Sequence, residues 1–152
     1  MAVVLTQEEA DELLGMLKKC SEISFNFPPK GKDNRLEAFA VIDESEKFII
    51  IVNRKNLHAD DKISFVAIYK KGNVKLLRLD LGVTASHTNP PRFGGQELKG
   101  PHLHIYRENY EDQYAEPFEI QSPELTDNFY KFLELFDIIE KPTVNRIEQE
   151  KL

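Results

Sequence analysis

Four short runs rich in β-branched and aromatic residues occupy the middle of the chain, and they constrain its fold most. They span residues 36–42, 47–53, 63–69 and 74–81. Runs of this length and composition, bounded by turn residues, are typical of β-strands. The short polar connections at 43–46 and 70–73 predict two antiparallel hairpins, the second helped by Gly72 and Asn73, which tolerate positive φ. Shorter runs at 23–27, 102–106 and 116–120 predict further strands.

Amphipathic segments near the two ends of the chain predict helices. The first covers about residues 7–20 and begins with a capping box, in which the Thr6 hydroxyl and the Glu9 carboxylate each accept a backbone N–H. The second covers about residues 123–140, with Ser122 as its N-cap. We therefore expect an α+β fold, with a single antiparallel β-sheet flanked by an N-terminal and a C-terminal helix.

Length and composition indicate one globular domain over residues 1–152, with a polar, frayed tail at 143–152. Hydrophobic residues make up 41% and charged residues 30%, which argues against intrinsic disorder. The single cysteine, Cys20, excludes an intrachain disulfide and favours a reducing compartment. No apolar run approaches the roughly 20 residues of a membrane helix, and the N-terminus lacks the basic region of a secretory signal. We expect a cytoplasmic protein without membrane contact.

The net charge of −6 is unevenly distributed along the chain. Residues 30–107 have 14 basic and 9 acidic side chains, whereas residues 108–152 have 4 basic and 12 acidic ones. Nucleic-acid binding depends on concentrated basic surface, which the middle of this chain supplies only locally. Charge therefore leaves the partner open between a protein and RNA, and it says nothing about oligomeric state.

Three of the four histidines lie in the Gly/Pro-rich stretch 82–114. In a strand over 102–106, alternation places His102, His104 and Tyr106 on one face. If strand 74–81 pairs with this strand, Arg78 and Asp80 lie beside them. The stretch also contributes five candidates around the histidine strand: His87, Thr88, Asn89, Arg92 and Tyr110.

These residue types support three functional hypotheses. In the first, which we favour, the stretch is the contact surface of a binding or regulatory module that needs no cofactor. In the second, the protein is a metal-independent, ribonuclease-like toxin. Histidine then supplies acid–base chemistry. Its catalytic candidates are His87, His102, His104, Arg78 and Tyr106. Whichever hypothesis holds, the candidate binding residues of the stretch are Arg92, Thr88, Asn89 and Tyr110.

In the third hypothesis, His102 and His104 bind zinc or iron together with Asp80, and either His87 or Glu108 could complete the shell. A purely structural role is the remaining interpretation. The histidines would then only hydrogen-bond the loop to the sheet.

Four segments carry a resemblance to a known family: residues 77–82, 87–90, 100–108 and 110–112. The third segment contains the signature GPHLHIYRE. The chain resembles a domain-of-unknown-function family of small bacterial proteins, found in low-GC Gram-positive bacteria and their mobile elements. The resemblance implies a bacterial, cytosolic accessory protein related to mobile elements or defence, including toxin–antitoxin systems.

Overall fold

The computed structural model describes residues 4–54 and 63–146. The helices in these residues are α1 (Gln7–Gly15), α2 (Leu125–Leu135) and a short 3-10 helix, η1 (Pro91–Phe93). The strands in chain order are β1 (Lys18–Cys20), β2 (Ser24–Asn26), β3 (Asp33–Ala40), β4 (Lys47–Asn53), β5 (Ser64–Tyr69), β6 (Val74–Asp80), β7 (Ser86–Thr88), β8 (Glu97–Lys99), β9 (His102–Ile105), β10 (Ala115–Pro117), β11 (Ile138–Glu140) and β12 (Thr143–Asn145).

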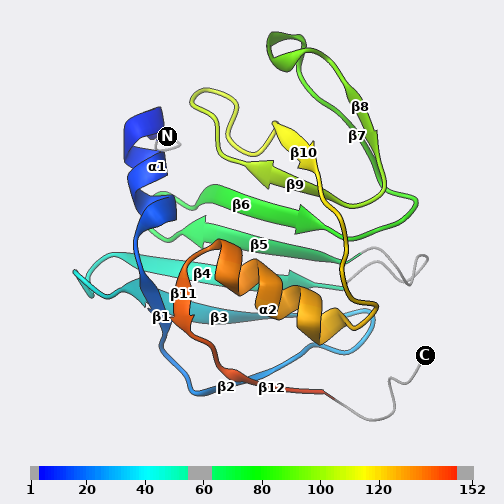
Figure 1. The fold of residues 1–152 in the computed structure, drawn as a ribbon. Helices are drawn as coiled ribbons and strands as arrows, with labels where there is room; N and C mark the ends of the chain where they lie inside the picture. Colours follow the sequence, from blue (N-terminus) through cyan, green and yellow to red (C-terminus); the bar gives the residue numbers. More distant parts are fainter. Residues whose placement is uncertain (1–3, 55–62, 147–152) are drawn as a thin grey trace.

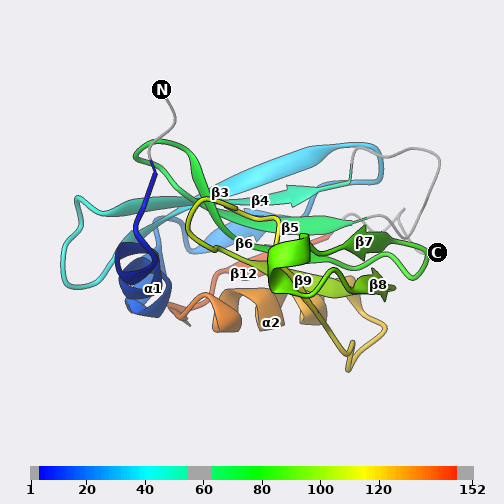
Figure 2. The ribbon, with the colours of Figure 1, turned by 90° about the horizontal axis from the view of Figure 1, so that it is seen from above.

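The main sheet has eight strands in the order β10-β9-β6-β5-β4-β3-β1-β11. Its neighbours are antiparallel except for β1 and β11, which are parallel. Two smaller sheets pair β2 with β12 in parallel and β7 with β8 in antiparallel orientation. Both α-helices lie on the same face of the main sheet (Figures 1 and 2). The expected single antiparallel sheet flanked by two helices is therefore wrong.

The core lies between the main sheet and α2. Alternate residues of β4, namely Phe48, Ile50 and Val52, are fully buried on this face. Their aromatic neighbours include Phe65 on β5, whose ring centroid lies 5.2 Å from that of Phe129 on α2. Burial of side chains of this size contributes about 1.5–3 kcal/mol each. The packing of this face against α2 determines the strand register, because a one-residue slip would turn the apolar side chains away from α2.

The predicted hairpins are confirmed, since β3 pairs with β4 and β5 pairs with β6 in antiparallel orientation. The predicted capping box of α1 is also confirmed, with Thr6 and Glu9 accepting each other's backbone N–H at 3.1 and 3.0 Å. The helix ends earlier than predicted, at Gly15. Residues 18–20 form β1 instead, because this segment fills the position between β3 and β11.

Lys18 explains much of this change from helix to strand. Its side chain is fully buried, and its ammonium group donates to the carbonyl oxygens of Leu14, Met16 and Phe136 at 3.1, 2.8 and 3.0 Å. Two of these carbonyls belong to the end of α1 and the residue after it, so Lys18 satisfies backbone acceptors that the helix leaves open. Leu17, predicted on the apolar face of a longer helix, is 55% exposed.

The C-terminal helix also differs from its prediction. It starts one residue after Glu124, which is the N-cap, and the Ser122 hydroxyl instead accepts the Glu124 N–H and donates to Asp127. Residues 138–140, predicted as the helix end, form β11. Residues 143–145, predicted as frayed, form β12, and the rest of the predicted tail from 147 onward lies outside the described residues. Neither α-helix of the described chain has the length and apolar character needed to span a membrane.

Candidate functional site

The pairing of β6 with β9 positions the candidate site. The two strands are antiparallel neighbours, with Asp80 opposite His102 and Arg78 opposite His104. Leu79 alternates with these residues and is fully buried on the α2 side. Because strand side chains alternate, the four polar residues lie together on the opposite, helix-free face of the sheet.

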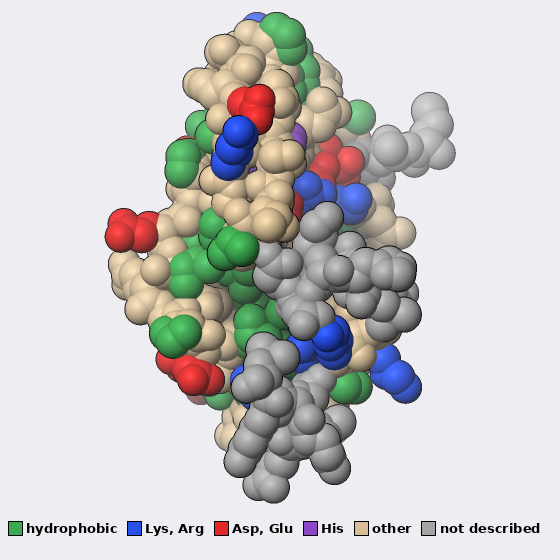
Figure 3. Space-filling view, turned by 90° about the vertical axis from the view of Figure 1, so that its right-hand side faces the viewer, with side chains coloured by type: hydrophobic (Ala, Val, Ile, Leu, Met, Phe, Trp, Pro, Cys, Tyr) green, Lys and Arg blue, Asp and Glu red, His purple; other side chains and the backbone are tan. Residues whose placement is uncertain are grey.

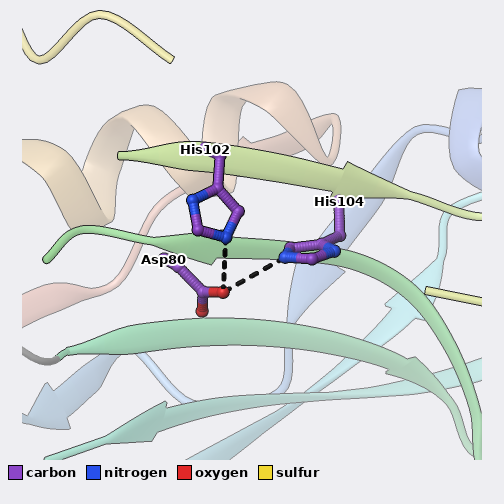
Figure 4. Close-up of side chains that lie close together, drawn as sticks. All are labelled: Asp80, His102 and His104. Carbon is purple, nitrogen blue, oxygen red and sulfur yellow. Dashed lines mark hydrogen bonds and ion pairs between the residues drawn. The ribbon is translucent and has the colours of Figure 1, made fainter. Parts of the chain in front are cut away.

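Two histidines converge on one carboxylate oxygen at this face (Figure 4). The Nε2 atoms of His102 and His104 each lie 3.1 Å from Oδ2 of Asp80. These three potential ligand atoms lie within 4.8 Å of one another. The imidazoles are 2% and 0% exposed, whereas the Asp80 side chain is 23% exposed. Seen from the side, the site shows little histidine surface among acidic and basic side chains (Figure 3).

Backbone carbonyls hold the other nitrogen of each imidazole. His102 Nδ1 lies 2.8 Å from the Gly100 carbonyl oxygen, and His104 Nδ1 lies 2.6 Å from that of Asp112. A carbonyl oxygen can only accept, so both Nδ1 atoms carry the proton. Gly100 has φ +83°, a left-handed conformation that glycine adopts without strain. The two imidazoles therefore direct their Nε2 atoms to the same small volume.

Hydrogen bonds among the described residues cannot satisfy both polar neighbours of His104 Nε2 at once. Nε2 of His104 lies 2.9 Å from Nη2 of Arg78, a donor, and 3.1 Å from Oδ2 of Asp80, an acceptor. A neutral Nε2 opposes the carboxylate oxygen, and a protonated Nε2 opposes the guanidinium N–H. Either protonation state leaves His104 with one unfavourable contact.

Arg78 connects the cluster to the loop after β9. Its Nη1 donates to Asp112 Oδ2 at 2.7 Å, and its Nη2 lies 3.4 Å from Asp80 Oδ2. Its Nε is buried without a hydrogen-bond partner among the residues described. Burial raises the pKa of Asp80, but the hydrogen bond to His104 and the charge of Arg78 outweigh it, so the pKa lies below its ordinary value. Asp80 is accordingly ionised at neutral pH.

A two-stranded arm, residues 86–99, rises beyond the β9–β10 edge of the main sheet (Figure 1). It carries His87, whose ring stacks on His102 at 5.6 Å between centroids and meets His104 edge-on at 4.6 Å. His87 Nε2 donates to the Gln113 carbonyl at 2.7 Å. Burial lowers the pKa of His87, which favours its neutral form at the site.

Asn89 fastens the arm to the edge strand β10. Its side-chain amide donates to the Ala115 carbonyl at 2.9 Å and accepts the Ala115 N–H at 2.8 Å. At the tip of the arm, Phe93 packs against Tyr110 and Tyr114, with ring centroids at 5.0 and 5.1 Å. Asn89 and Tyr110, predicted as binding residues, therefore hold the arm in place.

The structure places four other predicted site residues away from the cluster. Tyr106 lies beyond the end of β9, and its hydroxyl donates to the Leu5 carbonyl at 2.6 Å and accepts the Leu5 N–H at 3.2 Å. Thr88 and Arg92 are exposed on the arm. Glu108, a candidate ligand, accepts the N–H of Gln7 at 2.7 Å.

A cavity of about 460 Å³ opens beside the cluster. Asp80, His102, Arg78 and His87 contribute to its wall, together with residues from β5 and from the connection between β6 and the arm. Three hydroxyl-bearing residues, Ser64, Thr84 and Ser86, also line the cavity, as does Asn53. The cluster is thus buried where the backbone carbonyls hold the Nδ1 atoms, and it borders an open space where Asp80 lies.

Sequence reasoning missed Asp112, which contributes both a carbonyl to His104 and a carboxylate to Arg78. It also missed the carbonyls of Gly100 and Gln113 and the hydroxyl-bearing wall of the cavity. Backbone acceptors leave no trace in residue identity. The only signal for Asp112 is its position in an acidic turn shortly after the histidine strand, among residues with positive φ such as Asn109 and Glu111.

The fold and the site together define the class of protein. It has a mixed β-sheet with both α-helices on one face and, on the other face, an Asp–His–His cluster with buried imidazoles beside a β-arm. The chain belongs to a family of unknown function (DUF6978), which matches residues 5–138. No curated protein and no solved structure matches the chain. The expected membership in an uncharacterised family is confirmed, whereas the bacterial range and the GPHLHIYRE signature stay predictions.

Proposed function

We propose that this protein binds a divalent transition-metal ion of the zinc or iron(II) type through Asp80 Oδ2, His102 Nε2 and His104 Nε2. One observation carries the proposal. Two buried imidazoles, each fixed by a carbonyl at Nδ1, direct their Nε2 atoms to the same carboxylate oxygen. Metal-binding histidines are held in this way in proteins, with the distal N–H donated to a carbonyl or carboxylate.

The distances support this assignment. Zinc–nitrogen and zinc–oxygen bonds of about 2.0–2.2 Å at tetrahedral or octahedral angles separate neighbouring ligand atoms by about 2.8–3.5 Å. Both nitrogen-to-oxygen separations at the site, 3.1 Å, lie within this range. An ion placed among the three atoms would also remove the conflict at His104, because the Nε2 lone pair and the carboxylate oxygen would both face a cation.

The donor set indicates which ions fit. Two imidazole nitrogens with one carboxylate suit zinc, and they also suit iron(II) in the two-histidine, one-carboxylate arrangement. Three protein ligands leave coordination positions open, which is typical of catalytic rather than structural zinc sites. In such a site the ion activates a bound water for hydrolysis. The cavity beside Asp80 and His102 gives a substrate access to that position.

The metal-independent ribonuclease hypothesis receives less support. It needs imidazoles that reach a substrate, but His102 and His104 are buried and both ring nitrogens of each already have polar neighbours. Tyr106, a further catalytic candidate, is bound to Leu5. The accessory role related to mobile elements or defence rests on the resemblance in sequence and on no contact in the site.

Metal content of the purified protein tests the proposal. Apoprotein is incubated with Zn²⁺, or with Fe²⁺ under anaerobic conditions, desalted and analysed for metal and for folding by circular dichroism. We expect one equivalent in the wild type and in His87→Gln, a control that removes the nearby histidine outside the ligand set. We expect loss in His102→Ala and His104→Ala. Folded wild-type protein that retains neither ion would overturn the proposal.

A further inference from the structure

The cavity beside the cluster suggests what the metal site binds. Its charged wall consists of Asp80 and Arg78, with His87 and His102 beside them. The hydroxyls of Ser64, Thr84 and Ser86 add hydrogen-bond donors. A cavity of about 460 Å³ holds far more than a water molecule. Its wall is therefore suited to a polar, oxygen-rich ligand.

Charge at the site depends on the metal. Among the described groups, Asp80, Asp112 and Arg78 form one connected set with a net charge of −1. A divalent ion bound by neutral imidazoles changes this net charge to +1. Apoprotein should therefore repel an anion from the cavity and metal-loaded protein should attract it.

Arg78 gains free donors when the ion binds. Its Nη2 now lies against His104 Nε2 and Asp80 Oδ2, two of the three atoms that the ion would use. Its Nε already lacks a hydrogen-bond partner within the described part of the chain. Nε–H and one Nη2–H form one edge of a guanidinium group, and that edge binds two oxygens of an oxyanion in parallel. Asp112 holds the opposite side of the group through Nη1 at 2.7 Å.

We propose that the metal-loaded site binds a phosphate group, with one oxygen on the open metal position and others on the Arg78 guanidinium edge, in a phosphate ester whose remainder is polar. The inference rests on the proposed metal site. Phosphate is favoured over a carboxylate because of the number of contacts that the site offers. The ion, the guanidinium edge and the hydroxyl groups together can contact more than the two oxygens of a carboxylate. The hydroxyl groups face the part of the cavity that the rest of the ester would fill.

Cobalt(II) substitution tests the inference with inorganic phosphate as the probe. Protein loaded with one equivalent of Co²⁺ is titrated with phosphate while the visible cobalt absorption is followed, and apoprotein is titrated by calorimetry. We expect a saturable spectral change in the loaded protein, no binding heat in apoprotein, and at least about tenfold weaker binding of acetate. Sodium chloride at matched ionic strength serves as the blank.

The Arg78→Lys variant keeps the positive charge but loses the two-donor edge, and it should weaken phosphate binding about tenfold while retaining Co²⁺. Lys75→Met on the same strand removes an exposed charge and should leave phosphate binding unchanged. Cobalt uptake without a phosphate response, or equal phosphate binding with and without cobalt, overturns this inference alone. Failure to take up cobalt overturns the metal proposal and this inference with it.

Discussion

His104 Nε2 lies 3.1 Å from Asp80 Oδ2, on the neighbouring strand of a sheet face that carries neither α-helix. The imidazole cannot rotate freely, because its Nδ1 is held by a carbonyl and its side chain is fully buried. This arrangement fixes the direction in which Nε2 points.

The two aspartates beside Arg78 should differ in their effect on metal binding. Asp80→Asn removes the charged ligand oxygen, so we expect zinc affinity to fall more than about 100-fold. Asp112→Asn alters a carboxylate that contacts Arg78 but keeps the carbonyl that holds His104, so we expect a loss of about tenfold or less. Competition with a chromophoric chelator measures both. Equal losses would show that Asp80 acts through general charge and is no ligand.

Tyr106 should matter for stability and not for the site. Tyr106→Phe removes the hydroxyl that bonds both the N–H and the carbonyl of Leu5, which is buried. We expect the free energy of unfolding to fall by about 1–3 kcal/mol in urea denaturation. Zinc affinity should remain that of the wild type. A large loss of zinc binding in a folded variant would contradict the placement of Tyr106 outside the site.

Asn89 should control how firmly the arm is attached. Asn89→Asp replaces the amide donor by an oxygen that faces the Ala115 carbonyl, whereas Asn89→Ala only removes both hydrogen bonds. We expect faster hydrogen exchange at the Ala115 amide in both variants. We also expect Asn89→Asp to lower the free energy of unfolding by about 1–3 kcal/mol, more than Asn89→Ala does. Unchanged exchange at Ala115 would show that the aromatic contacts of Phe93 suffice to hold the arm.

Lys18 should give the protein a measurable pH dependence. Burial lowers its pKa to about 8, against the opposing effect of the Asp137 charge. Between pH 8 and 10.5 the unfolded chain holds a proton that the folded chain has lost, so stability rises with pH in this window. The rise between pH 7.5 and 10 should be about 2 kcal/mol greater in wild type than in Lys18→Met. Taking this difference removes the effect of groups common to both proteins. Parallel pH profiles would contradict the assignment.

The helices and strands that the sequence predicted correctly are those in which the local pattern agrees with the long-range pairing. The runs that became β3, β4, β5 and β6 are rich in β-branched and aromatic residues and are joined in pairs by short turns. The convergence of Asp80 with His102 follows from strand alternation once β6 and β9 pair. The site's central residues were therefore predictable, although their roles were not.

Elements formed by distant segments were missed for a physical reason. Residues 18–20 and 138–140 each continue a helical pattern. They are strands because residues 18–20 pair with β3 on one side and, across about 120 residues, with 138–140 on the other. Residues 143–145, predicted as part of a frayed tail, form a strand by pairing with the distant β2. The arm was predicted as a loop because its strands are three residues long and its glycines and prolines dominate the composition. Lys18 fell within the predicted helix because basic residues are favoured in the last turn of a helix. Its complete burial is rare for a lysine.

X-ray absorption spectroscopy of the zinc-loaded wild-type protein examines the proposed metal site itself, because it counts imidazole ligands and measures their distances. We expect one zinc per chain with two imidazole nitrogens and only oxygen otherwise, at about 2.0–2.2 Å. The same measurement on His104→Ala should show one imidazole or no bound zinc. The proposed site would be contradicted by a zinc shell that contains sulfur, no imidazole or three imidazoles. It would also be contradicted if the folded protein bound no zinc.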